Sequence, residues 1–151
     1  MSVIAVVDVG SNSIKVAVVA ANDRKELGRK SEPVRLQPEG GPAEPFSSEA
    51  RAEAVAAIGR LLAYARSLGA TRCCLLATSA VRESVGRQDF AREVEAATGL
   101  PLTIVSGEVE ARLAAAGVRA DPAYQAYADI LSFDLGGGSL DVSVLRGQRC
   151  V

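Results

Sequence analysis

Apolar, β-branched runs near the start of the chain predict a β-hairpin. Residues 3–9 are almost all Val, Ile or Ala and predict a buried strand. A polar turn at 10–13 separates this run from a second apolar run at 14–20, so the two runs form a strand pair. A weaker third strand is expected over 25–36.

The rest of the chain alternates between helical and strand patterns. Helices are expected from 47–49 to the glycine at position 69, near 80–85, over 88–98 and over 107–117; strands are expected over 72–77, 102–105, 129–134 and 140–146. Strands that alternate with helices build parallel sheets, and the opening hairpin adds antiparallel strands. The pattern therefore predicts an α/β fold in which helices pack on a mixed sheet.

Two short segments are expected to face the core. In the helix over 107–117, the apolar residues Val109, Leu113 and Ala116 share one side and predict the buried face. Cys73 and Cys74 open an apolar run, which favours buried free thiols. Three cysteines, two of them adjacent, do not make a disulfide framework, so a reducing cytoplasmic location is expected.

Composition excludes several classes of function. With 151 residues, 48% hydrophobic and 23% charged, the chain is expected to fold rather than to be disordered. Its net charge of -1 excludes nucleic-acid binding driven by bulk charge, and the absence of His excludes His catalysis and His metal ligands. The first apolar run is interrupted by Asp8, so neither a signal peptide nor a membrane span is predicted.

The two predicted hairpins carry similar loops. Residues 8–13 read Asp-Val-Gly-Ser-Asn-Ser, and residues 134–139 read Asp-Leu-Gly-Gly-Gly-Ser. Glycines at a turn let several backbone N–H groups converge on one point, which makes an anion-binding concavity suited to phosphate. The Asp that precedes each loop supplies a hard oxygen ligand for Mg²⁺ or Ca²⁺. The alternative interpretation is two ordinary hairpins with glycine turns.

Two further segments carry candidate chemistry. Residues 77–83 follow a strand and include Arg82, whose planar guanidinium suits phosphate; the alternative is a helix start with a solvated Arg. Glu108 and Glu110 lie in the first turn of the helix over 107–117 and point about 200° apart, so only one of them is expected to face a cleft, where a carboxylate can deprotonate a water. Alternatively, both acids only complement the helix dipole.

Together these segments resemble the exopolyphosphatase/guanosine pentaphosphate phosphatase family, within the actin-like ATPase (sugar kinase/chaperone ATPase) superfamily. The matching stretches are residues 8–13, 34–36, 77–83, 106–113 and 134–139. The resemblance implies a ribonuclease H-like (actin-like ATPase) α/β domain over 1–125, built on a mixed five-stranded sheet flanked by helices. Residues 126–151 then form the opening β-hairpin of a second, similar domain.

The resemblance also implies roles for individual residues. Glu110 becomes the catalytic base, and Arg82 contacts the phosphate chain. The implied metal-associated carboxylates, for Mg²⁺ or another divalent cation, are Asp8, Asp134 and Asp141. The implied phosphate-binding residues are Gly10, Ser11, Asn12 and Ser13 in the first loop and Gly136, Gly137, Gly138 and Ser139 in the second. The family has Thr-Glu after that last serine, whereas this chain has Leu140-Asp141.

The function implied is release of the terminal phosphate from inorganic polyphosphate, guanosine pentaphosphate or both, through a Glu-activated water with Mg²⁺. Polyphosphate and guanosine penta- or tetraphosphate are then the partners, and a homodimer stays open. Two alternatives stand beside this function. One is a non-catalytic module that binds a guanosine polyphosphate for regulation, and the other is a kinase of the same superfamily.

The resemblance further leads us to expect an inactive fragment. Family members bind substrate between two similar domains, and residues 126–151 match only the start of the second one. The hairpin over 126–151 is expected to add to the first sheet or to pair with another copy, because exposed strand edges attract further strands.

Overall fold

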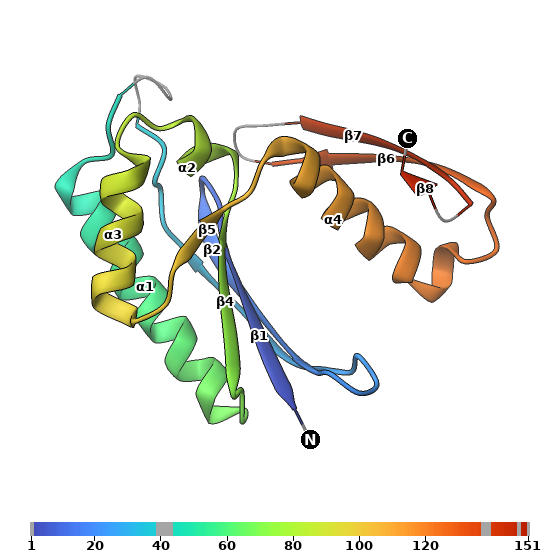
Figure 1. Ribbon diagram of the computed structural model, residues 1–151, viewed down its shortest axis with the longest axis horizontal. Helices are drawn as coiled ribbons and strands as arrows, with labels where there is room; N and C mark the ends of the chain where they lie inside the picture. The colour runs from blue at the N-terminus through green and yellow to red at the C-terminus, as the bar shows by residue number, and fades with distance from the viewer. Residues whose placement is uncertain (1, 39–43, 137–139, 148, 151) are drawn as a thin grey trace. The chain divides into compact units, whose positions relative to one another are not determined.

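The computed structural model describes residues 2–38, 44–136, 140–147 and 149–150. The chain divides into two compact units, Met1–Ile104 (unit 1) and Val105–Val151 (unit 2). Figure 1 shows the elements of each unit along the chain. In the described part of the chain, no helix is long and apolar enough to cross a membrane.

Unit 1 is built on a mixed five-stranded sheet, as the sequence predicts. Its strands are β1 (Val3–Val9), β2 (Ser13–Ala20), β3 (Glu26–Pro33), β4 (Arg72–Ala77) and β5 (Leu102–Ile104), in the spatial order β3-β2-β1-β4-β5. β1, β2 and β3 pair antiparallel, whereas β4 runs parallel to β1 and β5 parallel to β4. The opening hairpin and the later β-α-β units therefore share one sheet.

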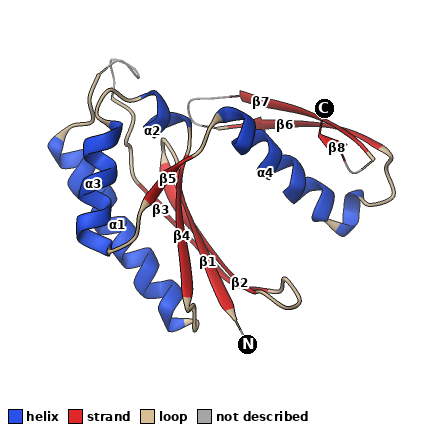
Figure 2. Cartoon of the chain, viewed as in Figure 1, coloured by secondary structure: helices blue, strands red, loops and turns tan. Residues whose placement is uncertain are grey.

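Three helices belong to unit 1: α1 (Ser48–Ser67), α2 (Ser79–Glu83) and α3 (Arg87–Thr98). α1 contacts β1, β2 and β3, and α3 packs against α1 and β5. Figure 2 shows α1 and α3 on one side of the sheet. The alternate residues of β1 and β2 that face this side form the core, and Val7, Val9 and Ile14 are fully buried there.

The ends of α1 follow from its sequence. The Ala50 N–H donates to Ser47 Oγ at 3.1 Å, so Ser47 is the N-cap. Gly69 has φ +85°, and its N–H donates to the Arg66 carbonyl, which ends the helix in the left-handed conformation that glycine tolerates. Both helix signals read from the sequence are confirmed.

Two predictions about unit 1 are wrong in detail. The third strand ends at Pro33 rather than at residue 36, because proline has no N–H to donate to the ladder and the next residues bond to the loop after β1 instead. Cys73 is only half-buried and Cys74 is exposed, since Cys74 lies on the sheet face opposite to α1 and α3.

Unit 2 contains α4 (Gly107–Ala120), a 3₁₀ turn η1 (Pro122–Tyr124), and the strands β6 (Asp129–Leu135), β7 (Leu140–Arg146) and β8 (Arg149–Cys150). The strands form a separate sheet in the order β6-β7-β8, so the expectation that this hairpin adds to the first sheet is wrong. α4 packs on β7 and β6. The compact units thus divide before α4, while the family-domain boundary at 125 stays a prediction.

The buried face of α4 differs from the predicted one. Val109 and Leu113 are 41% and 52% exposed, and Ala116 is exposed as well, whereas Ala115 is buried. Half-buried Ala111 and Val118 lie on the same side as Ala115, four and three residues away along the helix. Small side chains let the helix approach its sheet closely, and the larger apolar residues point elsewhere. Ser106 caps this helix by accepting from the Val109 N–H at 3.3 Å.

Candidate functional site

The loop between β1 and β2 is held on a buried frame. Fully buried Val9 and Ile14 flank it, and Ser11 within it is only 7% exposed. The Gly10 N–H donates to the Ser13 carbonyl at 3.2 Å, and a Cβ at position 10 would lie 3.1 Å from that same oxygen. Glycine therefore permits a close backbone approach here. The first predicted phosphate loop is a tight turn anchored at both ends.

A second segment binds this loop from the side. The Val34 N–H donates to the Asn12 carbonyl at 3.2 Å, and the Leu36 N–H donates to the Ser11 carbonyl at 2.9 Å. Val34 and Leu36 are buried, so Arg35 between them faces the other way and is exposed. Arg35 and Asn12 line one cavity of unit 1. The sequence analysis gave Arg35 no role, although the apolar-Arg-apolar alternation is a signal for an outward-facing Arg.

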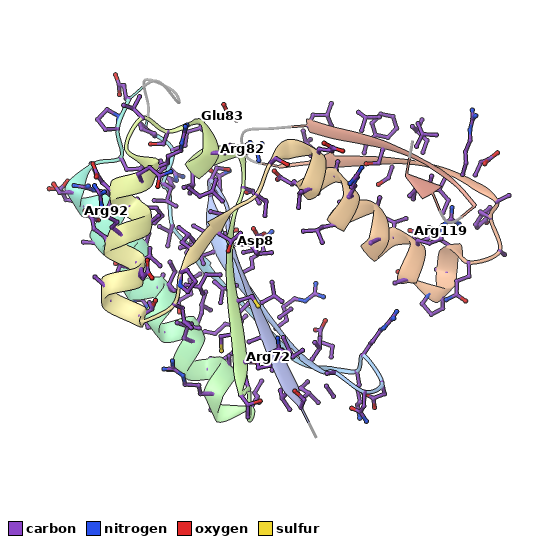
Figure 3. All side chains as sticks on the ribbon, in the orientation of Figure 1. Asp8, Arg72, Arg82, Glu83, Arg92 and Arg119 are labelled. Atoms are coloured by element: carbon purple, nitrogen blue, oxygen red, sulfur yellow. The ribbon has the colours of Figure 1, made fainter. Side chains whose placement is uncertain are left out.

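The segment with Arg82 starts at the same end of the sheet. Val9 and Ala77 are register partners in parallel strands, and the Thr78 N–H donates to the Val9 carbonyl at 3.4 Å. α2 therefore begins beside the first loop, at the carboxyl ends of β1 and β4, where α/β sheets place ligands. Figure 3 shows Arg82 on α2 and Arg72 toward the other end of the sheet.

Local contacts hold Arg82 in place. Its Nε lies 3.1 Å from Glu83 Oε1, and its backbone carbonyl accepts from Arg87 Nη1 at 2.9 Å. The Arg82 side chain is 25% exposed, so its guanidinium stays partly accessible while α2 and α3 orient it. A partly accessible guanidinium that is fixed in this way suits a phosphate.

Asp8 has a cationic neighbour that the sequence analysis did not single out. Asp8 and Lys15 are register partners across β1 and β2, and both line a cavity of about 220 Å³ together with Arg29. Figure 3 shows Asp8 on β1. The only sequence signal for Lys15 is its polarity within the apolar second strand. The strands β1, β2 and β3 thus place a carboxylate and two cations on the sheet face away from the core.

The two candidate acids of α4 have different surroundings in unit 2. Glu108 is exposed and its Oε1 lies 2.8 Å from Arg112 Nη2, one turn further along the helix. Glu110 is half-buried in the first turn, and its N–H donates to the Ser106 carbonyl at 2.9 Å. Glu108 is therefore engaged in a surface ion pair, and Glu110 lies on a different side of the helix.

The second loop is described only in part. Asp134 on β6 is exposed and is the register partner of Asp141 on β7; Gly136 is exposed, and Gly137, Gly138 and Ser139 lie outside the described residues. Carboxylate oxygens are the donors that Mg²⁺ prefers, and the strand register places Asp134 and Asp141 opposite each other, so these residue types at these positions fit a divalent cation.

The described residues do not assemble a complete metal site by themselves. Among them, no three Asp, Glu or Cys side chains come together as a potential metal cluster. Asp8 belongs to unit 1, and Asp134 and Asp141 belong to unit 2. The structure thus brings Asp8, the first loop and the Arg82 segment together within unit 1, and Asp134 beside Asp141 within unit 2.

Comparison with known proteins gives a consistent result. The model of the Ppx/GppA phosphatase family matches residues 15–150. An uncharacterised protein of Streptomyces coelicolor is 34% identical over 145 residues, which cover 95% of this chain and 43% of that protein. Exopolyphosphatase 1 of Mycobacterium tuberculosis is 31% identical over 141 residues, covering 91% of this chain and 41% of that protein.

Solved structures show the same fold. An exopolyphosphatase from Cytophaga hutchinsonii superposes with a TM-score of 0.86 at 23% identity, covering 99% of this chain and 48% of that one. A Ppx/GppA enzyme of Aquifex aeolicus gives a TM-score of 0.81 at 20% identity and covers 50% of that chain. This chain therefore spans less than half the length of the curated relatives it matches. Its fold is that of the actin-like ATPases, and the chain belongs to the Ppx/GppA phosphatase family.

Proposed function

We propose that this protein hydrolyses the terminal phosphoanhydride bond of inorganic polyphosphate, guanosine pentaphosphate or both. One observation carries the proposal: in a chain of this family, the first glycine loop and the Arg82 segment meet at the carboxyl end of one sheet. Fixed N–H groups and a guanidinium at one point suit a phosphate that must be held while its bond breaks.

The proposed reaction uses Glu110 as general base. Its carboxylate takes a proton from a water as that water attacks the terminal phosphorus in line with the leaving oxygen. The P–O bond to the rest of the chain breaks, and the products are inorganic phosphate and a chain one phosphate shorter. The loop at 10–13 and Arg82 stabilise the charge on the transferred phosphoryl group.

A divalent cation has a place in this proposal. Asp8, Asp134 and Asp141 are the carboxylates that would hold Mg²⁺, and Asp134 and Asp141 are already register partners. When bound, such an ion neutralises negative charge on the phosphate oxygens. Asp141 stands where the resemblance leads us to expect a Glu, so its carboxylate has one methylene less with which to reach.

The test is phosphate release by the full-length protein, from long-chain polyphosphate and from guanosine pentaphosphate with Mg²⁺ present, because residues 1–151 alone are expected to be inactive. Glu110→Gln keeps the size of the side chain and removes the base, so we expect the rate to fall about 10²–10⁴-fold. Glu108→Gln is the matched control, because Glu108 lies in the same helix turn as Glu110 but is exposed and paired with Arg112. A Glu110→Gln protein with unchanged rate, or no release from either substrate before mutation, would overturn the proposal.

A second candidate function is supported by one departure from the family pattern. Leu140-Asp141 replaces the expected Thr-Glu, which removes a hydroxyl and shortens a carboxylate beside the second loop. A module that binds a guanosine polyphosphate without hydrolysing it would tolerate these changes. Tight binding of guanosine tetraphosphate together with no phosphate release from any substrate would favour this function over hydrolysis.

A further inference from the structure

A large cavity of unit 1 lies directly beside the first loop. Its volume is about 960 Å³, near the upper end of the roughly 300–1,000 Å³ typical of small-molecule sites. Polar side chains on its walls include Asn12, Arg35, Gln37, Glu44 and Ser47. Since Asn12 belongs to the predicted phosphate loop, a ligand held by that loop can extend into this cavity.

Arg35 lines the cavity and is placed to bind an anionic group there. The hydrogen bonds from Val34 and Leu36 to the loop fix the backbone on both sides of it. Within the described part of the chain, no carboxylate forms an ion pair with Arg35, whereas Arg29 and Arg51 each pair with one and Arg60 pairs with two. As far as the described residues show, the five N–H donors of Arg35 are therefore available to a ligand.

The remaining walls do not suit a run of phosphates. Each phosphate of a polyphosphate chain brings a negative charge, and the described lining residues of the cavity include one cation, Arg35, and the carboxylate of Glu44. A carboxylate accepts hydrogen bonds from hydroxyl and amino groups but repels phosphate oxygens. Pro33, Pro38 and Pro45 add apolar surface that phosphate cannot use but a sugar or a base can.

We propose that this cavity binds the nucleoside end of a nucleoside polyphosphate. Arg35 contacts the phosphate nearest the ribose, Glu44 accepts hydrogen bonds from ribose hydroxyl or base amino groups, and the prolines pack against the sugar and base. The inference rests on the proposed function and sharpens it, because it assigns a subsite that a nucleotide fills and inorganic polyphosphate leaves empty.

The experiment is a binding titration of the ¹⁵N-labelled chain, observed by NMR, with guanosine tetraphosphate and sodium tripolyphosphate as probes. We expect both probes to shift the amide signals of the loop at 10–13. Only the nucleotide should shift those of Gln37 and Ser47 at the cavity walls. Arg35→Gln should weaken nucleotide binding about tenfold, the effect of losing one charge-assisted hydrogen bond, and change tripolyphosphate binding less than twofold.

Two further variants complete the design. Glu44→Gln should weaken nucleotide binding and leave tripolyphosphate binding unchanged or slightly stronger, because a charge that repels phosphate is removed. Arg66→Gln, in the last turn of α1, is the matched control for loss of an Arg and should change neither affinity. Circular dichroism checks that each variant is folded.

Two results would overturn the inference. Equal loss of affinity for both probes in Arg35→Gln would show that the cavity holds phosphates. Nucleotide binding without shifts at Gln37 and Ser47 would place the nucleoside elsewhere. Neither result depends on turnover. The phosphate-release assay with Glu110→Gln can therefore contradict the proposed hydrolysis while the nucleoside subsite is confirmed, or support hydrolysis while the subsite is contradicted.

Discussion

Each unit contains two antiparallel strands joined by a glycine-containing segment, but the sheets of the two units are covered differently. In unit 1, the faces of β1 and β2 that meet the helices are sealed, and Val7 and Val16 are at most 1% exposed. In unit 2, Leu145 and Ser143 are buried on one face of β7. On the other face of the same sheet, Phe133 of β6 is 63% exposed.

The difference shows that the local sequence pattern that forms a hairpin is distinct from the burial that stabilises it. Both hairpins have alternating strands and a glycine turn, so both form locally. Only the first has a closed second layer over its apolar face, and burial of apolar surface is the main favourable term in folding. The apolar face of unit 2 is continuous across two strands; its residues are Leu131, Phe133 and Leu135 on β6 and Leu140 and Val142 on β7. Exposed apolar surfaces of this kind bind other protein surface or aggregate.

The contrast extends to the two predicted phosphate loops. The loop at 10–13 is flanked by buried residues and hydrogen-bonded from the side by Val34 and Leu36, so its backbone N–H groups are fixed before a ligand arrives. The loop after β6 is flanked by Leu135 and Leu140, which are 80% and 57% exposed. A prearranged site binds phosphate without an ordering cost. The first loop is therefore expected to bind phosphate without rearranging.

The largest effect is expected when equivalent truncations are made in the two units. Phe90 is fully buried and packs edge-on against Phe46, with ring centroids 5.6 Å apart. Phe90→Ala should lower the free energy of unfolding by about 3–5 kcal/mol, because it leaves a cavity in the core. Phe133→Ala removes an exposed ring and should change it by less than about 0.5 kcal/mol. Urea denaturation of both variants measures the difference.

A comparable loss in both variants would break the comparison. It would mean that the β6–β7 face is covered in solution, for example by another copy of the chain. Measuring Phe133→Ala at two protein concentrations separates these cases, because a face covered by association loses more stability at high concentration. Phe133→Ala should also reduce binding of a hydrophobic dye, while Phe90→Ala should not.

Much of unit 1 could be predicted from the sequence because its signals agree with its packing. β1 and β2 alternate in the way a half-covered strand must, and α1 has a serine N-cap and a glycine at its end. The glycine loop and the Arg82 segment could also be predicted to meet, since parallel neighbouring strands place their carboxyl ends together.

The errors arise where tertiary packing, and not local pattern, decides which face is buried. In α4, large apolar residues indicated a face through Val109 and Leu113, but the helix packs through Ala115, which periodicity ranks lower. Cys74 belongs to an apolar run, yet its strand is covered on the other side only. The placement of Arg35 beside the first loop could not be predicted from local pattern, because it depends on hydrogen bonds from Val34 and Leu36 to a loop about twenty residues away.

A smaller effect is expected at the helix caps. Ser47→Ala removes the acceptor for the Ala50 N–H and should cost about 1 kcal/mol in urea denaturation, while the exposed neighbour Ser48→Ala is the control. Ser106→Ala removes the corresponding cap of α4. It should leave hydrogen exchange at the Val7 and Val16 amides unchanged, because those amides report on unit 1. Faster exchange there in Ser106→Ala would show that the two units unfold as one.

The smallest effect concerns an ion pair that joins two layers of unit 1. Glu32 on β3 accepts from Arg60 Nε at 2.7 Å, and Lys30 Nζ lies 3.4 Å away. The hydrogen bond from Arg60 lowers the pKa of Glu32 below its ordinary value, against a weaker opposing effect of burial. A carboxylate whose pKa is lowered on folding stabilises the protein above its unfolded pKa, about 4.3 for Glu, and loses that contribution as the pH falls through the folded pKa.

Glu32→Gln should therefore lower the melting temperature at pH 7 by less than Ser47→Ala does, since exposed ion pairs contribute little. The difference in melting temperature between Glu32→Gln and the unmodified protein should disappear as the pH falls below about 4. Glu108→Gln in unit 2 breaks an exposed pair within a single helix and is the control for loss of a surface carboxylate. A gap for Glu32→Gln that stays constant from pH 7 to pH 3 would show that Glu32 contributes through packing and not through its charge.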